Sequence, residues 1–171
     1  MPAARVPVRV TRVRPQDWPA WRQIRLEALE DTPIGFVELL ADARQRTDAQ
    51  WQERAAAAAE GDAHGLWLAW DGERPVGCTG AVRYEPGDDA LVYSVYVSPT
   101  ARGGDVLDQL LGAVTAWART LDGGTRLRLE VHEDNARARA AYARRGFVET
   151  GGTAPYPPDP SRSELEMVRP L

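Results

Sequence analysis

The sequence contains no lysine, a single cysteine and only two histidines. One cysteine cannot form an intrachain disulfide, so a disulfide-stapled scaffold is excluded and the cytoplasm is the expected compartment. No apolar run approaches the length of a transmembrane helix, and residues 1–10 lack the apolar core of a signal peptide. We therefore expect a protein that does not bind a membrane.

Positive charge is also limited. All 21 basic residues are arginine, against 25 acidic residues, and the net charge is -4 with a pI of about 5.3. No basic cluster stands out, which argues against nucleic acid as a partner while leaving room for a local patch that holds an anionic cofactor. The length of 171 residues suits one domain with a proper core and is too short for two domains, so we predict a single domain over 1–171.

The most informative stretch is 91–111, which is typical of a strand, a glycine turn and a helix. The β-branched and aromatic run at 92–97 predicts a strand that ends at Ser98 and Pro99, because proline cannot donate to a strand ladder. After a turn at 100–104, apolar residues recur at intervals of three and four, which predicts a helix. The first amides of such a helix have no partner within it, so this turn is a candidate phosphate site.

A second strand and helix follow at 127–147 and end at Gly146, which suits a left-handed C-cap. Because a helix links the two strands, we expect them to be parallel. Before these units the sequence predicts a strand at 6–14, a helix capped by Asp17 and reaching about residue 30, helices at 34–46 and 49–60, and a hairpin of 66–70 and 76–84. After them it predicts a short strand to about 150, a loop at 151–160 and a strand at 164–169. This order predicts an α/β (α+β) fold around one largely antiparallel sheet.

Two motifs carry a family resemblance. V-x-P-x-x-R-G at 97–103, followed by L-E-V-x-x-x-N-x-x-A-x-x-x-Y-x-x-x-G-F at 129–147, resembles the GNAT superfamily of N-acetyltransferases. The resemblance covers the whole chain and is strongest over 91–150. It implies a mixed sheet of about seven strands flanked by about four or five helices, with two parallel central strands splayed apart for acyl-CoA. It also implies an enzyme that transfers the acetyl group of acetyl-CoA directly to a primary amine.

The resemblance assigns roles to individual residues. In the family, backbone N–H groups of the first splayed strand hold the thioester carbonyl, and the following loop and helix start hold the pyrophosphate. The matching cofactor-binding positions are Val95, Tyr96, Val97, Arg102, Gly103, Gly104, Asp105, Val106, Leu107, Asn135 and Tyr142. Tyr142 is also the implied general acid, since a phenol with a pKa of about 10 is protonated at neutral pH. Glu130 is the candidate general base, with Glu85 and a chain of waters as the alternative.

One departure from the family pattern concerns the phosphate loop. The family usually reads Q/R-x-x-G-x-G/A, whereas Asp105 and Leu107 occupy the two later small positions here. Asp105 could cap the amides that should receive the pyrophosphate, and its charge would repel that ligand. Three outcomes are compatible with this loop: weakened binding of acetyl-CoA, binding of a different acyl-CoA, or loss of the cofactor. The alternative to an enzyme is a non-catalytic acyl-CoA-sensing or protein-binding module on the same fold.

The acceptor is expected between the early helices and the final loop and strand. The candidate lining residues are Glu27, Phe36, Tyr84 and Tyr156, and the acceptor stays open between a small-molecule amine and a peptide N-terminus. A metal site at 132–134 is rejected, because contiguous strand-end residues point in different directions. An acetyl-enzyme on Cys78 is disfavoured, because a lone apolar strand cysteine is more often part of a core. Relatives are often dimers, so a homodimer is compatible with the sequence.

Overall fold

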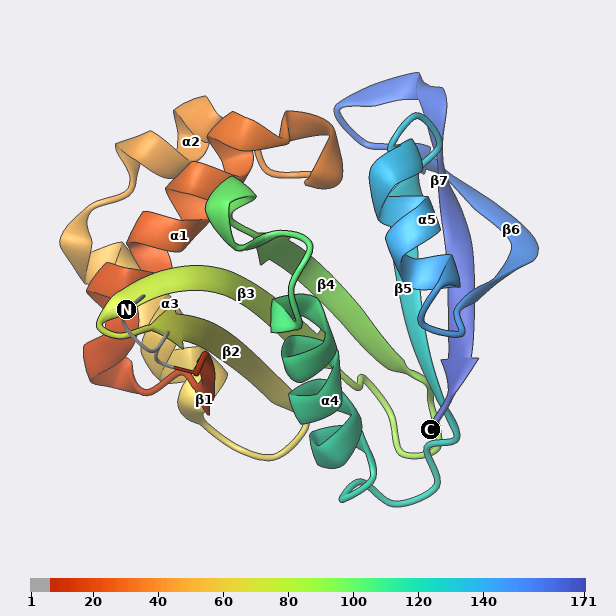
Figure 1. The fold of residues 1–171 in the computed structure, drawn as a ribbon, viewed down its shortest axis with the longest axis horizontal. Coiled ribbons are helices and arrows are strands. Elements are labelled where there is room, and N and C mark those ends of the chain that lie inside the picture. The colour runs from red at the N-terminus through yellow and green to blue at the C-terminus, as the bar shows by residue number, and fades with distance from the viewer. Residues whose placement is uncertain (1–6) are drawn as a thin grey trace, which may run out of the picture.

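The computed structural model describes residues 7–171 and contains one seven-stranded sheet (Figure 1). The strand order is β1-β2-β3-β4-β5-β7-β6, in which β4 and β5 are parallel and every other neighbouring pair is antiparallel. The strands are β1 (Arg9–Arg12), β2 (His64–Asp71), β3 (Arg74–Val82), β4 (Ala90–Val97), β5 (Arg126–His132), β6 (Val148–Tyr156) and β7 (Asp159–Pro170). The predicted mixed sheet with a parallel central pair is confirmed. Residue 6 of the predicted first strand lies outside the described residues.

Helices cover both faces of this sheet. Helices α1 (Trp18–Asp31), α2 (Leu40–Gln45) and α3 (Asp48–Ala59) lie on one face, while α4 (Val106–Ala118) and α5 (Ala136–Ala143) lie on the other (Figure 1). The sheet therefore separates two hydrophobic cores. Trp51 and Ile24 belong to the core under α1 and α3, and Leu110 and Val114 belong to the core under α4. Within residues 7–171 no helix is long and apolar enough to cross a membrane.

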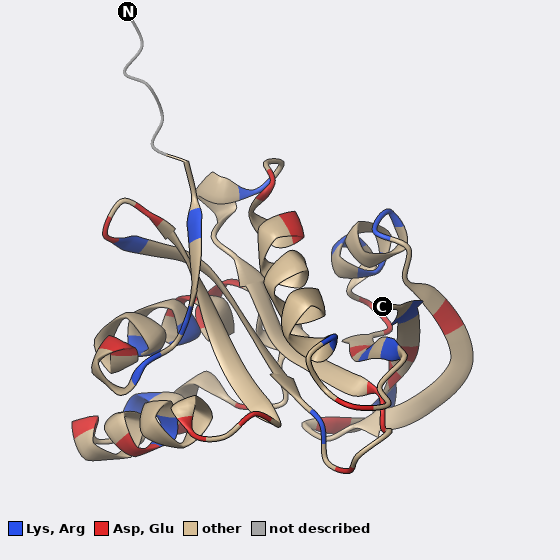
Figure 2. Cartoon of the chain, turned by 90° about the horizontal axis from the view of Figure 1, so that it is seen from below, with Lys and Arg blue, Asp and Glu red and all other residues tan. Residues whose placement is uncertain are grey.

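Charged residues are interspersed over the helices and strands (Figure 2), and several pairs join neighbouring elements. Arg145 follows α5 and pairs with Asp108 of α4 at 2.7 Å, and Arg139 of α5 pairs with Glu149 of β6 at 2.7 Å. These exposed pairs are individually weak, but they tie α5 to the elements on both sides of it.

The central parallel pair is short. β4 and β5 are in register only at Ala90 with Leu127 and at Leu91 with Arg128. Beyond these two pairs β4 continues along β3 as far as Val97, and β5 continues along β7 as far as His132. Each strand therefore stays paired on its outer side, and the sheet opens between them.

The predicted helix at 34–46 is wrong in its first half. A short 3-10 turn at Pro33–Gly35 is followed by an irregular segment with bends at Val37 and Glu38, and α2 begins only at Leu40. Arg25 of α1 contacts this segment, because its Cζ lies 4.7 Å from the centre of the Phe36 ring and its Nη2 lies 2.9 Å from the Glu38 carboxylate. Both side chains thus pack on Arg25 while the chain between Gly35 and Leu40 is not helical.

Two smaller predictions also need correction. Asp17 precedes α1, but its carboxylate accepts a hydrogen bond from the Arg14 amide at 2.9 Å instead of capping the helix. The predicted loop at 151–160 is mostly strand, because β6 runs to Tyr156 and β7 begins at Asp159. Its glycines and prolines are tolerated because β6 is an edge strand, whose ladder is interrupted by register shifts between Glu149 and Thr153 and between Pro155 and Tyr156.

The core under α4 yields a stability prediction. Leu110 is fully buried there, whereas Leu39 is 53% exposed, so the same truncation should have different effects at the two positions. We expect Leu110→Ala to lower the free energy of unfolding by about 3 kcal/mol and Leu39→Ala by less than about 0.5 kcal/mol. Denaturant unfolding measures both values, and equal losses would contradict the described core.

Candidate functional site

The gap between β4 and β5 contains a cleft of about 470 Å³. β4 lines it from Val92 to Val97, and β5 lines it from Leu129 to His132. The turn after α1 contributes Thr32, Gly35 and Phe36, and the loop after β4 with the start of α4 contributes Ala101, Arg102, Gly103, Gly104 and Leu107. The remaining lining residues belong to α5 or flank it: Asn135, Arg137, Ala138, Ala141, Tyr142, Arg144 and Arg145. Most of the residues predicted to bind a cofactor therefore meet at one place.

A bulge in β4 shapes one wall of this cleft. The register with β3 shifts between Cys78 and Gly80, and Ser94 has a φ of 53°. Ser94 is the only non-glycine with a positive φ among residues 7–171, and this conformation costs about 1–2 kcal/mol. The extra residue changes which side chains of β4 face each side of the sheet. Val92 packs under α4 whereas Tyr96 packs under α1, although residues four apart in a regular strand face the same side.

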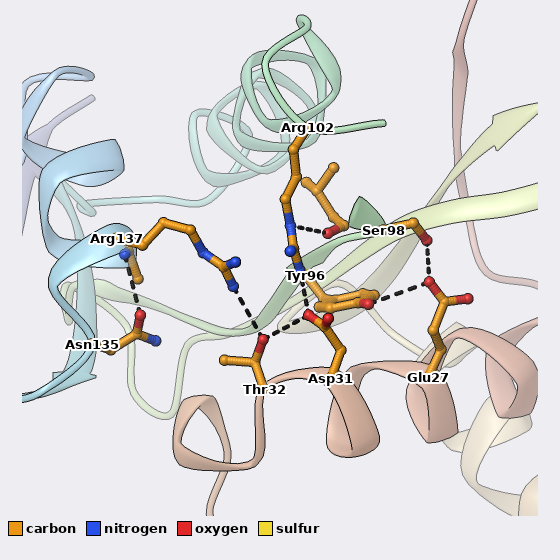
Figure 3. A network of polar contacts seen from close by, with 10 residues as sticks. Glu27, Asp31, Thr32, Tyr96, Ser98, Arg102, Asn135 and Arg137 are labelled. Atoms are coloured by element: carbon orange, nitrogen blue, oxygen red, sulfur yellow. Dashed lines mark hydrogen bonds and ion pairs between the residues drawn. The ribbon is translucent and has the colours of Figure 1, made fainter. Parts of the chain in front are cut away.

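Three polar side chains of α1 hold β4 and the loop after it, and Figure 3 shows two of them, Glu27 and Asp31. Arg25 donates to the Ser94 hydroxyl at 2.9 Å. Glu27 accepts hydrogen bonds from Tyr96 at 3.2 Å and from Ser98 at 2.5 Å. Burial, together with the adjacent Glu27 carboxylate, raises the pKa of Tyr96, so its hydroxyl remains a donor. The third side chain, Asp31, forms an ion pair with Arg102.

Arg102 lies at the open edge of β4. Besides its pair with Asp31, its Nε donates to the Val97 carbonyl at 3.0 Å. Thr32 donates to Asp31 at 2.8 Å and accepts from Arg137 of α5 at 3.1 Å (Figure 3). This chain of contacts spans the mouth of the cleft from the loop after β4 to α5.

The loop before α4 retains an open helix start. Gly103 has a φ of 79°, and an added Cβ there would meet nothing within 4 Å. The possible capping role of Asp105 is not observed, because its carboxylate instead accepts from the Gln109 side chain at 2.8 Å. The first amides of α4 therefore have no side-chain cap, which leaves donors for an anion. Val106 is in the core, whereas Leu107 lines the cleft.

α5 forms the wall opposite this loop. The Asn135 side chain caps α5 by accepting from the Ala138 amide at 3.2 Å. Tyr142 is 8% exposed and packs edge-on against Phe147 at 5.7 Å. Burial raises the pKa of Tyr142, which keeps the phenol protonated over the neutral range. The left-handed conformation expected of Gly146 is confirmed by its φ of 85°.

Glu130 lines the cleft from the other side of β5. Leu129 and Val131 belong to the core under α4, so Glu130 between them faces the opposite side of the sheet. Its carboxylate pairs with Arg128 at 3.1 Å. Glu164 lies on the neighbouring strand β7, and burial together with the Glu130 charge raises its pKa. The general-acid and general-base candidates thus approach the cleft from opposite faces of the sheet.

The predicted acceptor residues are only partly brought together. Phe36 lines the cleft, and its carbonyl accepts a hydrogen bond from the Tyr156 hydroxyl at 2.8 Å. Glu27 is engaged by β4 as described, behind the cleft wall. Tyr84 does not line the cleft, because its side chain is 71% exposed in the loop after β3, where Glu85 is also exposed. Sequence reasoning missed Arg25 and Ser94, for which no motif in the chain gives a signal.

Two other chemistries, an acetyl-enzyme on Cys78 and a metal site at 132–134, would need a reactive thiol and a cluster of metal ligands. Cys78 is fully buried, and burial raises the pKa of its thiol to about 12, which does not suit a nucleophile. In the part of the chain that the structure describes, no group of three or more His, Cys, Asp or Glu could hold a metal ion. The side chains of Glu133 and Asp134 pair with Arg162 instead.

Comparisons with known proteins agree with this geometry. The model of the Acetyltransferase (GNAT) family matches residues 18–147. The chain is 36% identical over 96 residues to an IAA acetyltransferase of Azospirillum brasilense, covering 56% of this chain and 61% of that protein. It is 30% identical over 139 residues to a mycothiol acetyltransferase of Salinispora tropica, covering 80% of this chain and 43% of that protein. The chain thus spans about half the length of the curated relatives it matches.

Solved structures share the fold. The PaiA N-acetyltransferase of Thermoplasma acidophilum, in complex with coenzyme A, has a TM-score of 0.76 at 14% identity, over 97% of this chain and 100% of that one. An acetyltransferase of Salmonella typhimurium that modifies the N-terminal serine of ribosomal protein L7/L12 has a TM-score of 0.76 at 15% identity, over 96% and 95%.

The burial of Cys78 predicts a thiol without reactivity in the folded state. We expect alkylation at a pH of about 8 to be at least about 100-fold slower in native protein than in denaturant, because only opened molecules react. The chain contains no other cysteine, so the mass added by iodoacetamide reports this site alone. Rapid labelling of the native protein would contradict the burial and reopen the acetyl-enzyme route.

Proposed function

The chain belongs to the GNAT family of acetyltransferases, and from this premise we propose that it moves the acetyl group of acetyl-CoA to a primary amine. The transfer is direct, in a ternary complex of the two substrates. The observation that carries the proposal is the opening between β4 and β5, which begins after Leu91 and is lined by backbone on one side and by Tyr142 on the other.

The residues around the cleft fit acetyl-CoA. Gly103, Gly104 and the uncapped amides of α4 supply donors for a pyrophosphate, and Arg102 adds a positive charge beside them. The backbone of Val95, Tyr96 and Val97 borders the deeper part of the cleft, where the thioester carbonyl would be polarised. Asn135 orders the start of α5. When bound, acetyl-CoA supplies an activated acyl thioester.

Two side chains handle protons in this proposal. The protonated phenol of Tyr142 donates to the departing thiolate, and its raised pKa keeps the proton in place until then. Glu130 accepts the proton that the ammonium form of the acceptor must lose before it attacks, directly or through one water. Since Glu130 and Tyr142 approach from opposite faces, the amine enters from the side of α1 and the final hairpin.

The acceptor is a small-molecule amine or a peptide N-terminus. Phe36 lines the cleft on the entry side, where Tyr156 supports it through the hydrogen bond to its carbonyl, and Glu130 also lines the cleft. An aromatic ring and a carboxylate at this border favour a cationic amine. The matched proteins are named as an IAA acetyltransferase, a mycothiol acetyltransferase and an acetyltransferase that modifies the N-terminal serine of a ribosomal protein, so they indicate no single acceptor and a screen of amines is needed to find it.

The role of Tyr142 is tested by turnover. We expect Tyr142→Phe to lower kcat by about 100-fold and to change the KM for acetyl-CoA little, because the phenol acts on the leaving group. The matched control is Tyr84→Phe, the same change at an exposed position outside the cleft, which should keep the parental rate. Thiol release from acetyl-CoA in the presence of an amine panel measures each rate. Parental turnover by Tyr142→Phe would remove it as the general acid.

The role of the altered phosphate loop is tested by binding. Removal of the negative charge in Asp105→Asn should tighten the Kd for acetyl-CoA by about two- to fivefold, since the helix start repels anions less without it. The control Asp42→Asn makes the same charge change on the exposed surface of α2. Calorimetric titration compares them. Absence of parental binding with recovery in Asp105→Asn would favour a non-catalytic protein-binding module over an enzyme.

A further inference from the structure

Arg25 is a buried charge on α1 with no role in the proposed proton transfers. It is 8% exposed and contacts three residues in two segments of the chain. Its Nε and Nη2 both lie 2.9 Å from Glu38, its Nη1 donates to the Ser94 hydroxyl at 2.9 Å, and its Cζ lies 4.7 Å from the centre of the Phe36 ring. A guanidinium stays charged in a protein, so its burial is unfavourable without such partners, and these partners fix its orientation.

The contact with Ser94 falls on the least favourable backbone conformation of β4. Ser94 has a φ of 53° at the bulge, where a serine does not remain without support. Arg25 holds the Ser94 side chain, and the thiol of Cys78 on the neighbouring strand β3 donates to the Ser94 carbonyl at 3.4 Å. The three residues after Ser94 are those proposed to receive the thioester. Their placement in the cleft therefore depends on the conformation of the bulge.

The contacts with Phe36 and Glu38 fall on the acceptor side. They hold the irregular segment 36–39 between the 3-10 turn and α2, and Phe36 of this segment lines the cleft. Tyr156 donates to the Phe36 carbonyl and joins the same segment to the end of β6. One guanidinium thus touches both the strand of the thioester side and the segment of the acceptor side.

We propose that Arg25 is a positioning residue of the acyl-transfer site, which holds the Ser94 bulge and the Phe36 segment in the relative placement that transfer requires. This inference rests on the proposed function. A small displacement of reacting groups reduces the rate of a step much more than it weakens binding, so the effect falls on kcat. A residue that only stabilises the fold would not act selectively on kcat.

The chain offers a matched control in Arg46. It is a second arginine on the same Glu38 carboxylate and stacks on Trp51 at 5.4 Å. Its contacts do not include Ser94 or Phe36 in the part of the chain that the structure describes. Arg46→Gln therefore removes a half-buried cation from the same cluster and leaves the bulge held.

The experiment compares parent, Arg25→Gln, Ser94→Ala, the double variant and Arg46→Gln. We expect Arg25→Gln to lower kcat at least about tenfold with the KM for acetyl-CoA within about threefold of the parent. Arg46→Gln should keep kcat within about twofold, even with a similar fall in Tm. The double variant should be no slower than Arg25→Gln, because Arg25→Gln already breaks the Arg25–Ser94 hydrogen bond that Ser94→Ala would remove. Equal kcat losses in Arg25→Gln and Arg46→Gln, or losses that multiply in the double variant, would overturn the proposal.

A readout without substrate keeps this test separate from the proposed function. Backbone hydrogen exchange over 92–97 should become at least about tenfold faster in Arg25→Gln and stay unchanged in Arg46→Gln. Unchanged exchange in Arg25→Gln overturns the holding of the bulge, whether or not the parent is active. A parent without turnover on any amine, with faster exchange in Arg25→Gln, overturns the proposed function and supports the holding of the bulge.

Discussion

The hydrogen bonding between β4 and β5 ends after two residue pairs, and the rest of the structure follows from that interruption. A sheet that opens exposes backbone groups, which are unfavourable unless something else binds them. Here β3 satisfies one edge of β4, and β7 satisfies one edge of β5 along its full length. The unpaired edges face one another across the cleft. The cleft is therefore a feature of the backbone, and the side chains around it set its chemical character.

Keeping the sheet open requires a rigid support behind β4, and α1 provides it. A helix that packs on a sheet usually presents apolar residues to it, and α1 does so with Ile24 and Ala28. The same helix places Arg25, Glu27 and Asp31 against the strand and its loop. Buried polar contacts add little net stability, but their directionality selects one conformation of the strand.

The elements that depend on local pattern were predictable from the sequence. The hydrophobic period predicted the helix after β4, and Gly146 indicated the C-terminal end of α5. The bulge was not predictable, because five of the six residues at 92–97 are apolar or aromatic, so the run has no alternation whose phase an extra residue would shift. Only the structure reveals that Val92 and Tyr96 belong to different cores. The non-helical segment 36–39 was not predictable either, because its contacts with Arg25 of α1 are not visible in its own sequence pattern.

The open gap has a counterpart at the outer edge of the sheet, where β6 is a long strand with a free side. Its ladder with β7 is broken twice, Gly151 takes a φ of 87°, and Pro155 lacks an amide proton. A free strand edge is normally a template on which another chain can add a strand. The irregular path of β6 removes the regular spacing of donors and acceptors that such an addition needs. We therefore expect any association at this edge to rely on side-chain contacts and not on the addition of a strand.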